Sequence, residues 1–116
     1  MARKDVLGRS GEDLAVDHLL GRGYAIVERN WRCAMGEIDI IARLASTTVV
    51  VEVKTRSGPG YGHPLESVTP AKLARLRRLA GAWAFENGPV ERLRIDAIAI
   101  ITGRTGITVE HVEQVC

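Results

Sequence analysis

The sequence predicts an α/β fold in which helices flank a mixed β-sheet, with elements in the order α-β-β-β-α-β-β. Two segments, residues 10–20 and 69–88, carry apolar residues at helical spacing. A valine-rich run at residues 48–55 is typical of a buried strand. The chain has 116 residues, of which 46% are hydrophobic. That length and composition predict a single domain over residues 1–116.

The first expected helix covers residues 10–20. Ser10 can cap its first turn, where Glu12 and Asp13 interact favourably with the helix dipole. Glycines at positions 21 and 23 end it. Its apolar stripe consists of Ala15, Val16, Leu19 and Leu20. We therefore expect the helix to pack one face on the sheet, with Glu12 leaning toward that face.

Three strands are expected next, at residues 24–30, 37–42 and 48–55. The third is the most strongly indicated, because its β-branched residues include Val49, Val50, Val51 and Val53. Residues 43–47 are few enough to form a hairpin loop between the second and third strands. These two strands are therefore expected to be antiparallel neighbours.

The rest of the chain is expected to form a loop, a second helix and two more strands. Residues 57–64 are rich in Gly and Pro, which predicts a mobile loop. Thr69-Pro70 opens the helix as a cap followed by proline at the first position, and Asn87-Gly88-Pro89 closes it. The stripe expected to be buried contains Leu73, Leu76, Leu79, Ala80 and Trp83. The last strands are expected at residues 94–101 and 107–112.

Composition argues against several classes of protein. No apolar run approaches the roughly 18 residues of a transmembrane helix, and no apolar stretch of a secretory signal follows the first residues. Cys33 and Cys116 suggest neither a disulfide framework nor a metal-ligand pattern. These features predict a cytoplasmic protein without membrane contact. The net charge of +2 is too balanced to indicate a nucleic-acid partner, so the placement of charges matters more.

Charged residues on two predicted neighbouring strands are the main indication of function. Side-chain alternation predicts that Glu37, Asp39 and Ile41 share one face, and that Ile38, Ile40 and Ala42 share the other. In the next strand Glu52, Lys54 and Arg56 share a face. If Asp39 lies near Glu52, the two carboxylates repel and lose hydration. Mg²⁺ or Mn²⁺ would offset that charge. Lys54 could stabilise negative charge on a phosphate or, with a lowered pKa, help to deprotonate a water.

Each of these features also has a structural interpretation. A Glu-x-Lys triplet on a strand is most often a solvated edge or a cross-strand ion pair. An acid such as Glu12 is more often a helix-start residue than a ligand, and a basic helix face is often simply solvated. The combination favours a site, because a helix acid, a strand Asp and a Glu-x-Lys on the adjacent strand occur in this order.

This combination resembles the PD-(D/E)XK nuclease superfamily. The whole chain is similar to the YraN family, an uncharacterised family of endonuclease-like proteins related in fold to archaeal Holliday-junction resolvases. The matching residues are Gly11-Glu12, Asn30, Gly36-Glu37-Ile38-Asp39, Val51-Glu52-Val53-Lys54-Thr55-Arg56, Gly62-His63-Pro64, Lys72 and Arg94-Ile95-Asp96. Two positions depart from the pattern: Ile38 replaces the proline of the motif, and Ile95 stands where we expect an aromatic residue.

The resemblance implies a restriction-endonuclease-like core and hydrolysis of phosphodiester bonds. Asp39 and Glu52 would bind Mg²⁺ or Mn²⁺ with the Val53 carbonyl as a third ligand, and Glu12 would join directly or through water. Lys54 would be the catalytic lysine. The substrate implied is structured DNA, branched or damaged, as in repair or recombination. Resolvases of this fold also suggest a symmetric homodimer.

Basic residues near this predicted site could neutralise nucleic-acid phosphates. They are Arg56 after the third strand, Lys72, Arg75, Arg77 and Arg78 on the second helix, and Arg3, Lys4 and Arg9 near the N-terminus. Tyr61 and His63 could stack on bases, although an ordinary surface loop is the more frequent case. His18 and His111 are interpreted as surface or core residues.

Two other functions are compatible with the same residues. One is a non-catalytic nucleic-acid-binding or adaptor protein that keeps the nuclease fold. The other is a protein-interaction module whose carboxylates only form ion pairs.

Overall fold

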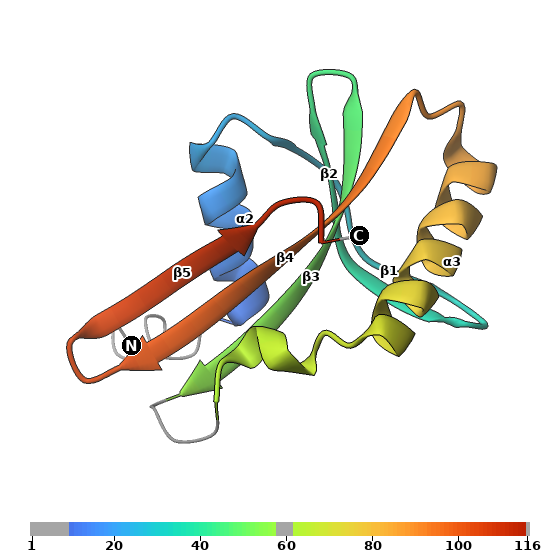
Figure 1. Ribbon diagram of the computed structural model, residues 1–116. Helices are drawn as coiled ribbons and strands as arrows, with labels where there is room; N and C mark the ends of the chain where they lie inside the picture. Colours follow the sequence, from blue (N-terminus) through green and yellow to red (C-terminus); the bar gives the residue numbers. More distant parts are fainter. Residues whose placement is uncertain (1–9, 58–61, 116) are drawn as a thin grey trace.

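The computed structural model describes residues 10–57 and 62–115, and their elements follow the predicted order α-β-β-β-α-β-β (Figure 1). The structure does not describe Arg3, Lys4, Arg9, Cys116 or residues 58–61 of the predicted loop, which include Tyr61. The elements are α2 (Gly11–Gly21), β1 (Ala25–Cys33), β2 (Gly36–Leu44), β3 (Thr47–Ser57), the 3₁₀ turn η1 (Pro64–Ser67), α3 (Pro70–Asn87), β4 (Arg92–Gly103) and β5 (Gly106–Val112).

The described strands form a mixed sheet in the order β1-β2-β3-β4-β5. β3 and β4 pair in parallel, whereas the other neighbouring pairs are antiparallel. A parallel pair needs a crossover connection, and η1 with α3 supplies it. This topology confirms the predicted α/β class.

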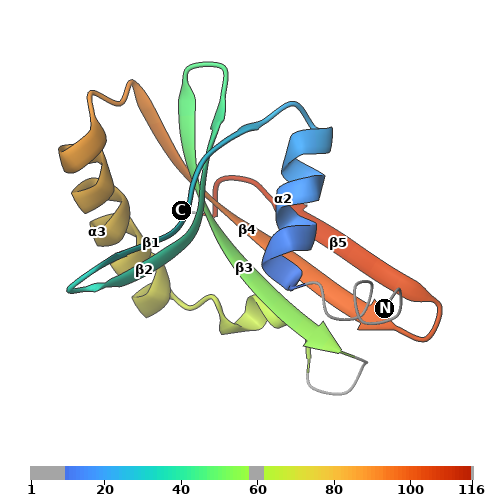
Figure 2. The same cartoon turned by 180° about the vertical axis from the view of Figure 1, so that it is seen from behind.

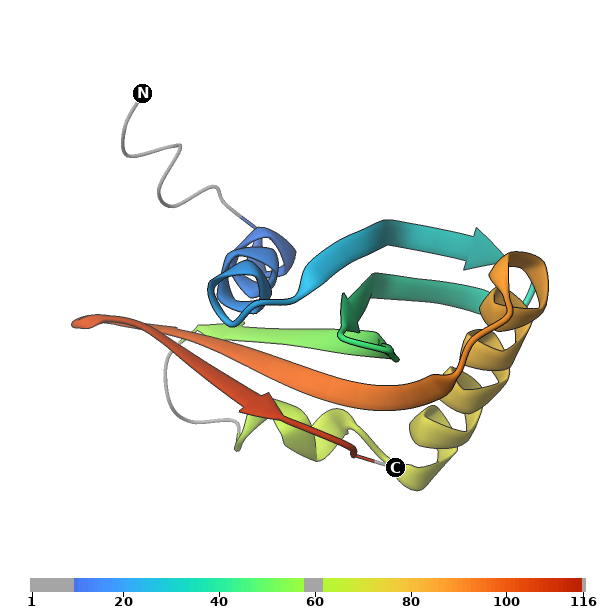
Figure 3. The same ribbon diagram turned by 90° about the horizontal axis from the view of Figure 1, so that it is seen from above.

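Helices α2 and α3 cover opposite faces of the sheet, as the views from behind and from above show (Figures 2 and 3). The cluster under α2 contains Ala15, Leu19, Tyr24, Ile40, Ala42, Val49, Val51, Ile98 and Ile100. The cluster under α3 contains Trp31, Ile38, Ile41, Val50, Leu76, Leu79, Ala80, Trp83 and Ile95. Alternate residues of β3 therefore serve two cores, which explains its nearly continuous run of valines.

Both helices begin at the predicted caps. The Ser10 hydroxyl accepts a hydrogen bond from the Asp13 backbone N–H at 3.0 Å, and the Thr69 hydroxyl accepts one from Lys72 at 3.3 Å. The predicted stripe of α2 is wrong at Leu20, whose side chain is exposed. Among the described residues, neither helix combines the length and apolar character that a bilayer span requires.

The hairpin between β2 and β3 is tighter than predicted. The strands extend through the expected 43–47 loop and pair up to Leu44 and Thr47, so the turn is left to Ala45 and Ser46. Ala45 adopts a positive φ of 53°, which a two-residue hairpin turn demands.

β2 bends away from β3 near its N-terminal end, where the site lies. The β2–β3 ladder reaches Ile40, opposite Val51, and stops there, although β2 begins at Gly36. The outer half of β2 remains paired to β1 and wraps toward α3 (Figure 3). The predicted shared face of Ile38 and Ile40 is therefore wrong. Ile38 packs in the α3 cluster, because the bend turns it away from the α2 cluster where Ile40 lies.

Gly11 allows the start of α2 to approach β3. A Cβ atom there would lie 2.0 Å from the Thr55 hydroxyl oxygen and 3.2 Å from its Cβ. We expect Gly11→Ala to lower the free energy of unfolding by about 1–3 kcal/mol, because either the Thr55 side chain or the start of α2 must shift to make room for the added methyl group. Urea denaturation followed by circular dichroism measures this. Gly21→Ala is the matched control, since a Cβ there meets nothing within 4 Å. Equal effects of the two substitutions would refute the tight contact.

Candidate active site

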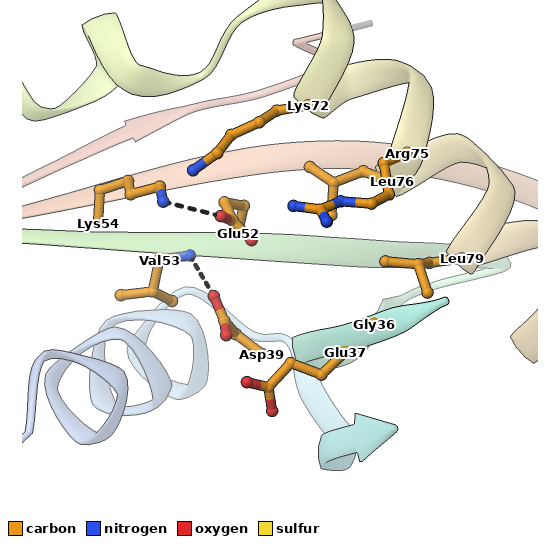
Figure 4. Close-up of a pocket in the computed structure, with 10 residues that line it drawn as sticks. All are labelled: Gly36, Glu37, Asp39, Glu52, Val53, Lys54, Lys72, Arg75, Leu76 and Leu79. Atoms are coloured by element: carbon orange, nitrogen blue, oxygen red, sulfur yellow. Dashed lines mark hydrogen bonds and ion pairs between the residues drawn. The ribbon is translucent and has the colours of Figure 1, made fainter. Parts of the chain in front are cut away.

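A pocket of about 300 Å³ opens where β2 leaves β3, beneath the first turns of α3 (Figure 4). Its polar lining includes Asp39 from β2, Glu52 and Lys54 from β3, and Lys72 and Arg75 from α3. Carboxylates on the sheet thus face basic side chains on the helix. The predicted proximity of the side chains at positions 39, 52 and 54 is present in this structure.

Asp39 occupies the gap left by the departing strand. Its Oδ2 accepts a hydrogen bond from the Val53 backbone N–H at 2.8 Å. That N–H lies beyond the last β2–β3 pair, so the carboxylate takes the place of a strand partner. Within an extended strand the N–H and C=O of one residue point to the same edge. The Val53 carbonyl therefore faces the same gap.

The environment of Asp39 disfavours its charged form. Burial raises the pKa of Asp39 to about 6, and the negative charges of Glu52 and Glu12 act in the same direction. The hydrogen bond from Val53 opposes this effect and is outweighed. An ionised Asp39 therefore lacks sufficient positive charge nearby.

Lys54 links the carboxylates to α3. Its Nζ lies 3.2 Å from Glu52 Oε2. The pKa of Lys54 is raised, first by a hydrogen bond with Lys72 and then by the bond and charge of Glu52. The pKa of Lys72 is lowered by the same contact, because Lys72 can accept a hydrogen bond from the Lys54 ammonium only when Lys72 itself is neutral. Of the two amines, Lys72 loses its proton more readily.

Glu12 lies outside the lining of the pocket. Its Oε1 is 3.4 Å from Arg29 Nε on β1, and the same guanidinium bonds Asp13 at 2.6 Å. Glu12 therefore influences Asp39 through its charge and does not share the pocket. Sequence reasoning missed Arg29, because no spacing pattern relates it to Glu12 and Asp13, which lie 17 and 16 positions earlier.

Some of the predicted phosphate-binding residues line the pocket and others lie outside it. Lys72 and Arg75 line the pocket, whereas Arg78 is exposed on α3 outside the lining. Arg56 follows Lys54 by two residues, so alternation places it on the same face of β3. His63 has a structural role. Its Nδ1 accepts a hydrogen bond from the Leu65 backbone N–H, and its Nε2 bonds Glu110 on β5.

Three oxygen groups at the gap could hold a metal ion: the carboxylates of Asp39 and Glu52 and the carbonyl of Val53. Within residues 10–57 and 62–115, no group of three or more His, Cys, Asp or Glu side chains is gathered as a metal site. Glu12 would have to move from Arg29 or act through water to contribute.

Comparison with known proteins places the chain in a family. A family model described as "Uncharacterised protein family UPF0102" matches residues 11–100, which include every residue of the pocket. The chain belongs to the UPF0102 family. A UPF0102 protein of Clavibacter michiganensis is 54% identical over 121 residues, covering 100% of both chains. A UPF0102 protein of Paenarthrobacter aurescens is 52% identical, covering 100% of this chain and 98% of the relative. The predicted YraN-family membership is thereby confirmed.

The raised pKa of Asp39 gives a pH-dependent prediction. The folded state holds this proton more tightly than the unfolded state, so the contribution of Asp39 to stability falls as pH rises from about 4 through about 6. We expect Asp39→Asn to stabilise the metal-free protein at pH 8. The shift corresponds to about 3 kcal/mol for an isolated group, which solvent screening reduces to about 1–2 kcal/mol.

Urea denaturation in chelator-containing buffer at pH 4.5 and pH 8 measures this difference. The stabilisation should be largest at pH 8 and clearly smaller at pH 4.5, where only part of the interval between the unfolded and the folded pKa of Asp39 has been passed. Glu37→Gln is the matched control, because Glu37 is a more exposed carboxylate on β2 that pairs with Arg32 at 3.3 Å. A variant less stable than the wild type at pH 8 would contradict the prediction.

Proposed function

We propose that this protein is a metal-dependent nuclease that hydrolyses phosphodiester bonds in structured DNA, branched or damaged. The observation that supports it most is the pocket that Asp39, Glu52 and Lys54 share, with Lys72 and Arg75 opposite. Acidic groups that suit a cation and basic groups that suit a phosphate thus border the same space.

Mg²⁺ or Mn²⁺ is the cofactor we propose. Asp39 and Glu52 with the Val53 carbonyl would hold it, because hard divalent cations prefer oxygen ligands and usually keep several waters. Burial and the neighbouring carboxylates raise the pKa of Asp39, and a divalent ion would offset both effects. Such an ion, when bound, polarises the scissile phosphate and lowers the pKa of a water molecule.

Residues of the chain would hold the substrate and stabilise charge. Lys54 is oriented by Glu52 and would face the negative charge that builds on the phosphate during cleavage. Lys72 and Arg75 would bind phosphates from the α3 side, and Arg56 and Arg78 would extend this surface. These side chains neutralise phosphates without reading bases, so the selectivity we propose is for DNA structure.

Cleavage assays test the proposal. Purified protein is incubated with branched and linear DNA in Mg²⁺ or Mn²⁺. We expect cleavage of branched DNA, and a loss of at least about 100-fold in Asp39→Ala and in Glu52→Ala. The control is Glu86→Ala, which removes an exposed carboxylate near the C-terminal end of α3. Cleavage that persists in both active-site variants would indicate a contaminant and leave the site without support.

A specific observation also favours a non-catalytic nucleic-acid-binding protein. Glu12 and Glu52 are already paired with Arg29 and Lys54, and three ligating side chains do not gather anywhere in the described residues. This function predicts DNA binding that weakens steeply with salt and survives Asp39→Ala and Glu52→Ala. It also predicts no cleavage with any divalent metal.

A further inference from the structure

Two histidines from distant parts of the sequence meet where α2 packs beside β5. His18 Nε2 lies 3.1 Å from His111 Nδ1, and the ring centroids are 5.2 Å apart in an edge-on arrangement. The two residues are 93 positions apart. They lie among residues separate from those that line the pocket of the candidate active site.

Asp96 fixes the orientation of the His111 ring. Its Nε2 lies 2.7 Å from Asp96 Oδ2, and the Asp96 side chain is fully buried. An ionised carboxylate only accepts hydrogen bonds, so His111 carries a proton on Nε2. In the neutral ring the lone pair of Nδ1 is then directed at His18. Imidazoles that ligate metals usually donate their other ring N–H to a carboxylate, a backbone carbonyl or water, and His111 has such a bond to Asp96.

His18 is less constrained than His111. Its ring is half-buried, and its pKa is lowered by burial, by the charge of His111 and by that of Arg22 at the end of α2. Around this pair stand Asp96 and Arg94 on β4 and Tyr24 before β1. A neutral imidazole is the form that binds metal.

The spacing of the two nitrogens suits a shared cation. Metal–nitrogen bonds of about 2.05 Å place two ligating nitrogens about 2.9 Å apart at a right angle and about 3.4 Å apart at a tetrahedral angle. The observed 3.1 Å lies between these values. Because the Nδ1 lone pair of His111 is directed at His18 Nε2, His18 would have to rotate aside, with its proton on Nδ1, for both lone pairs to reach one ion.

We propose that His18 and His111 form a two-imidazole site for a late first-row transition-metal cation such as Zn²⁺, Ni²⁺ or Cu²⁺. Imidazole nitrogen suits these ions, whereas the oxygen-rich pocket at Asp39 suits Mg²⁺ or Mn²⁺. Water completes the coordination. A bound ion would tie α2 to β5, and through Asp96 to β4, independently of the proposed nuclease activity.

Nuclear magnetic resonance of the histidine ring nitrogens tests the site directly. Untagged full-length protein at pH 7.5 is titrated with Zn²⁺. We expect the ¹⁵N resonances of His18 Nε2 and His111 Nδ1 to shift together and saturate at one equivalent, with His63 unchanged. Shifts at His63 alone, or none up to about 1 mM Zn²⁺, would overturn the proposal.

Calorimetry with Ni²⁺ supplies a second measurement. His18→Gln removes one ligand and should weaken binding by about tenfold or more. His63→Gln removes a histidine elsewhere and should bind Ni²⁺ as the wild type does. The double substitution Asp39→Asn and Glu52→Gln should also leave this binding in place, which separates it from the candidate active site. Wild-type affinity in His18→Gln would refute the site.

Discussion

Replacing Asp96 by alanine is expected to lower the free energy of unfolding by about 3–5 kcal/mol. Asp96 is a fully buried charge on β4. Arg94 donates to both of its oxygens at 2.9 Å, from Nε and Nη2, and His111 and the Gln114 backbone N–H donate at 2.7 and 2.9 Å. Alanine would leave these donors without their shared acceptor.

The same network determines how the stability of the protein changes as pH falls. Burial alone would raise the pKa of Asp96, but the bonds from His111, Arg94 and Gln114 outweigh it and hold the pKa below its ordinary value. A depressed pKa in the folded state means that this contribution is present above about pH 4 and is lost as pH falls further. The wild type should therefore lose stability in acid more steeply than Asp96→Ala.

Urea denaturation at pH 7 measures the effect of Asp96→Ala. Glu113→Ala is the matched control, because Glu113 is an exposed carboxylate 4.0 Å from the same Arg94 guanidinium. Its loss should cost less than about 1 kcal/mol. If the two substitutions cost the same, Asp96 is not the centre of the network.

Local patterns predicted most of the fold because its elements are specified by neighbouring residues. Caps at Ser10 and Thr69 and the valines of β3 identify their elements without knowledge of tertiary contacts. The bend of β2 could not be predicted in this way. It depends on where the β2–β3 ladder stops and on the packing of Ile38 beneath α3, which are both tertiary contacts.

The same distinction between local patterns and tertiary contacts applies to the side chains of the candidate site and of the Asp96 network. Asp39, Glu52 and Lys54 converge because two of them alternate on one strand and the third lies on its neighbour, which the sequence pattern already indicates. The Asp96 network joins Tyr24, Arg94 and His111 across as many as 87 residues, from 24 to 111, and no spacing rule relates such positions. Sequence reasoning accordingly assigned His111 no partner.

The two lysines of the pocket should differ in what they contribute to cleavage. Lys54 is held by Glu52 beside the carboxylates, so its charge lies where charge would develop on the phosphate. Lys54→Met is expected to lower the single-turnover cleavage rate by about 100- to 1,000-fold while changing DNA affinity little.

Lys72 extends from α3 on the opposite side of the pocket and would act on the bound substrate. Lys72→Met should weaken DNA binding and reduce the salt-dependence slope by about 1, with a smaller loss of the single-turnover rate. Binding measured across salt concentrations, together with single-turnover kinetics at saturating DNA, separates the two effects. Equal losses of rate in both variants would show that the lysines act as one unit. Unchanged rates in both would remove Lys54 from the reaction, because an ammonium next to the reacting phosphate cannot be neutral to its cleavage.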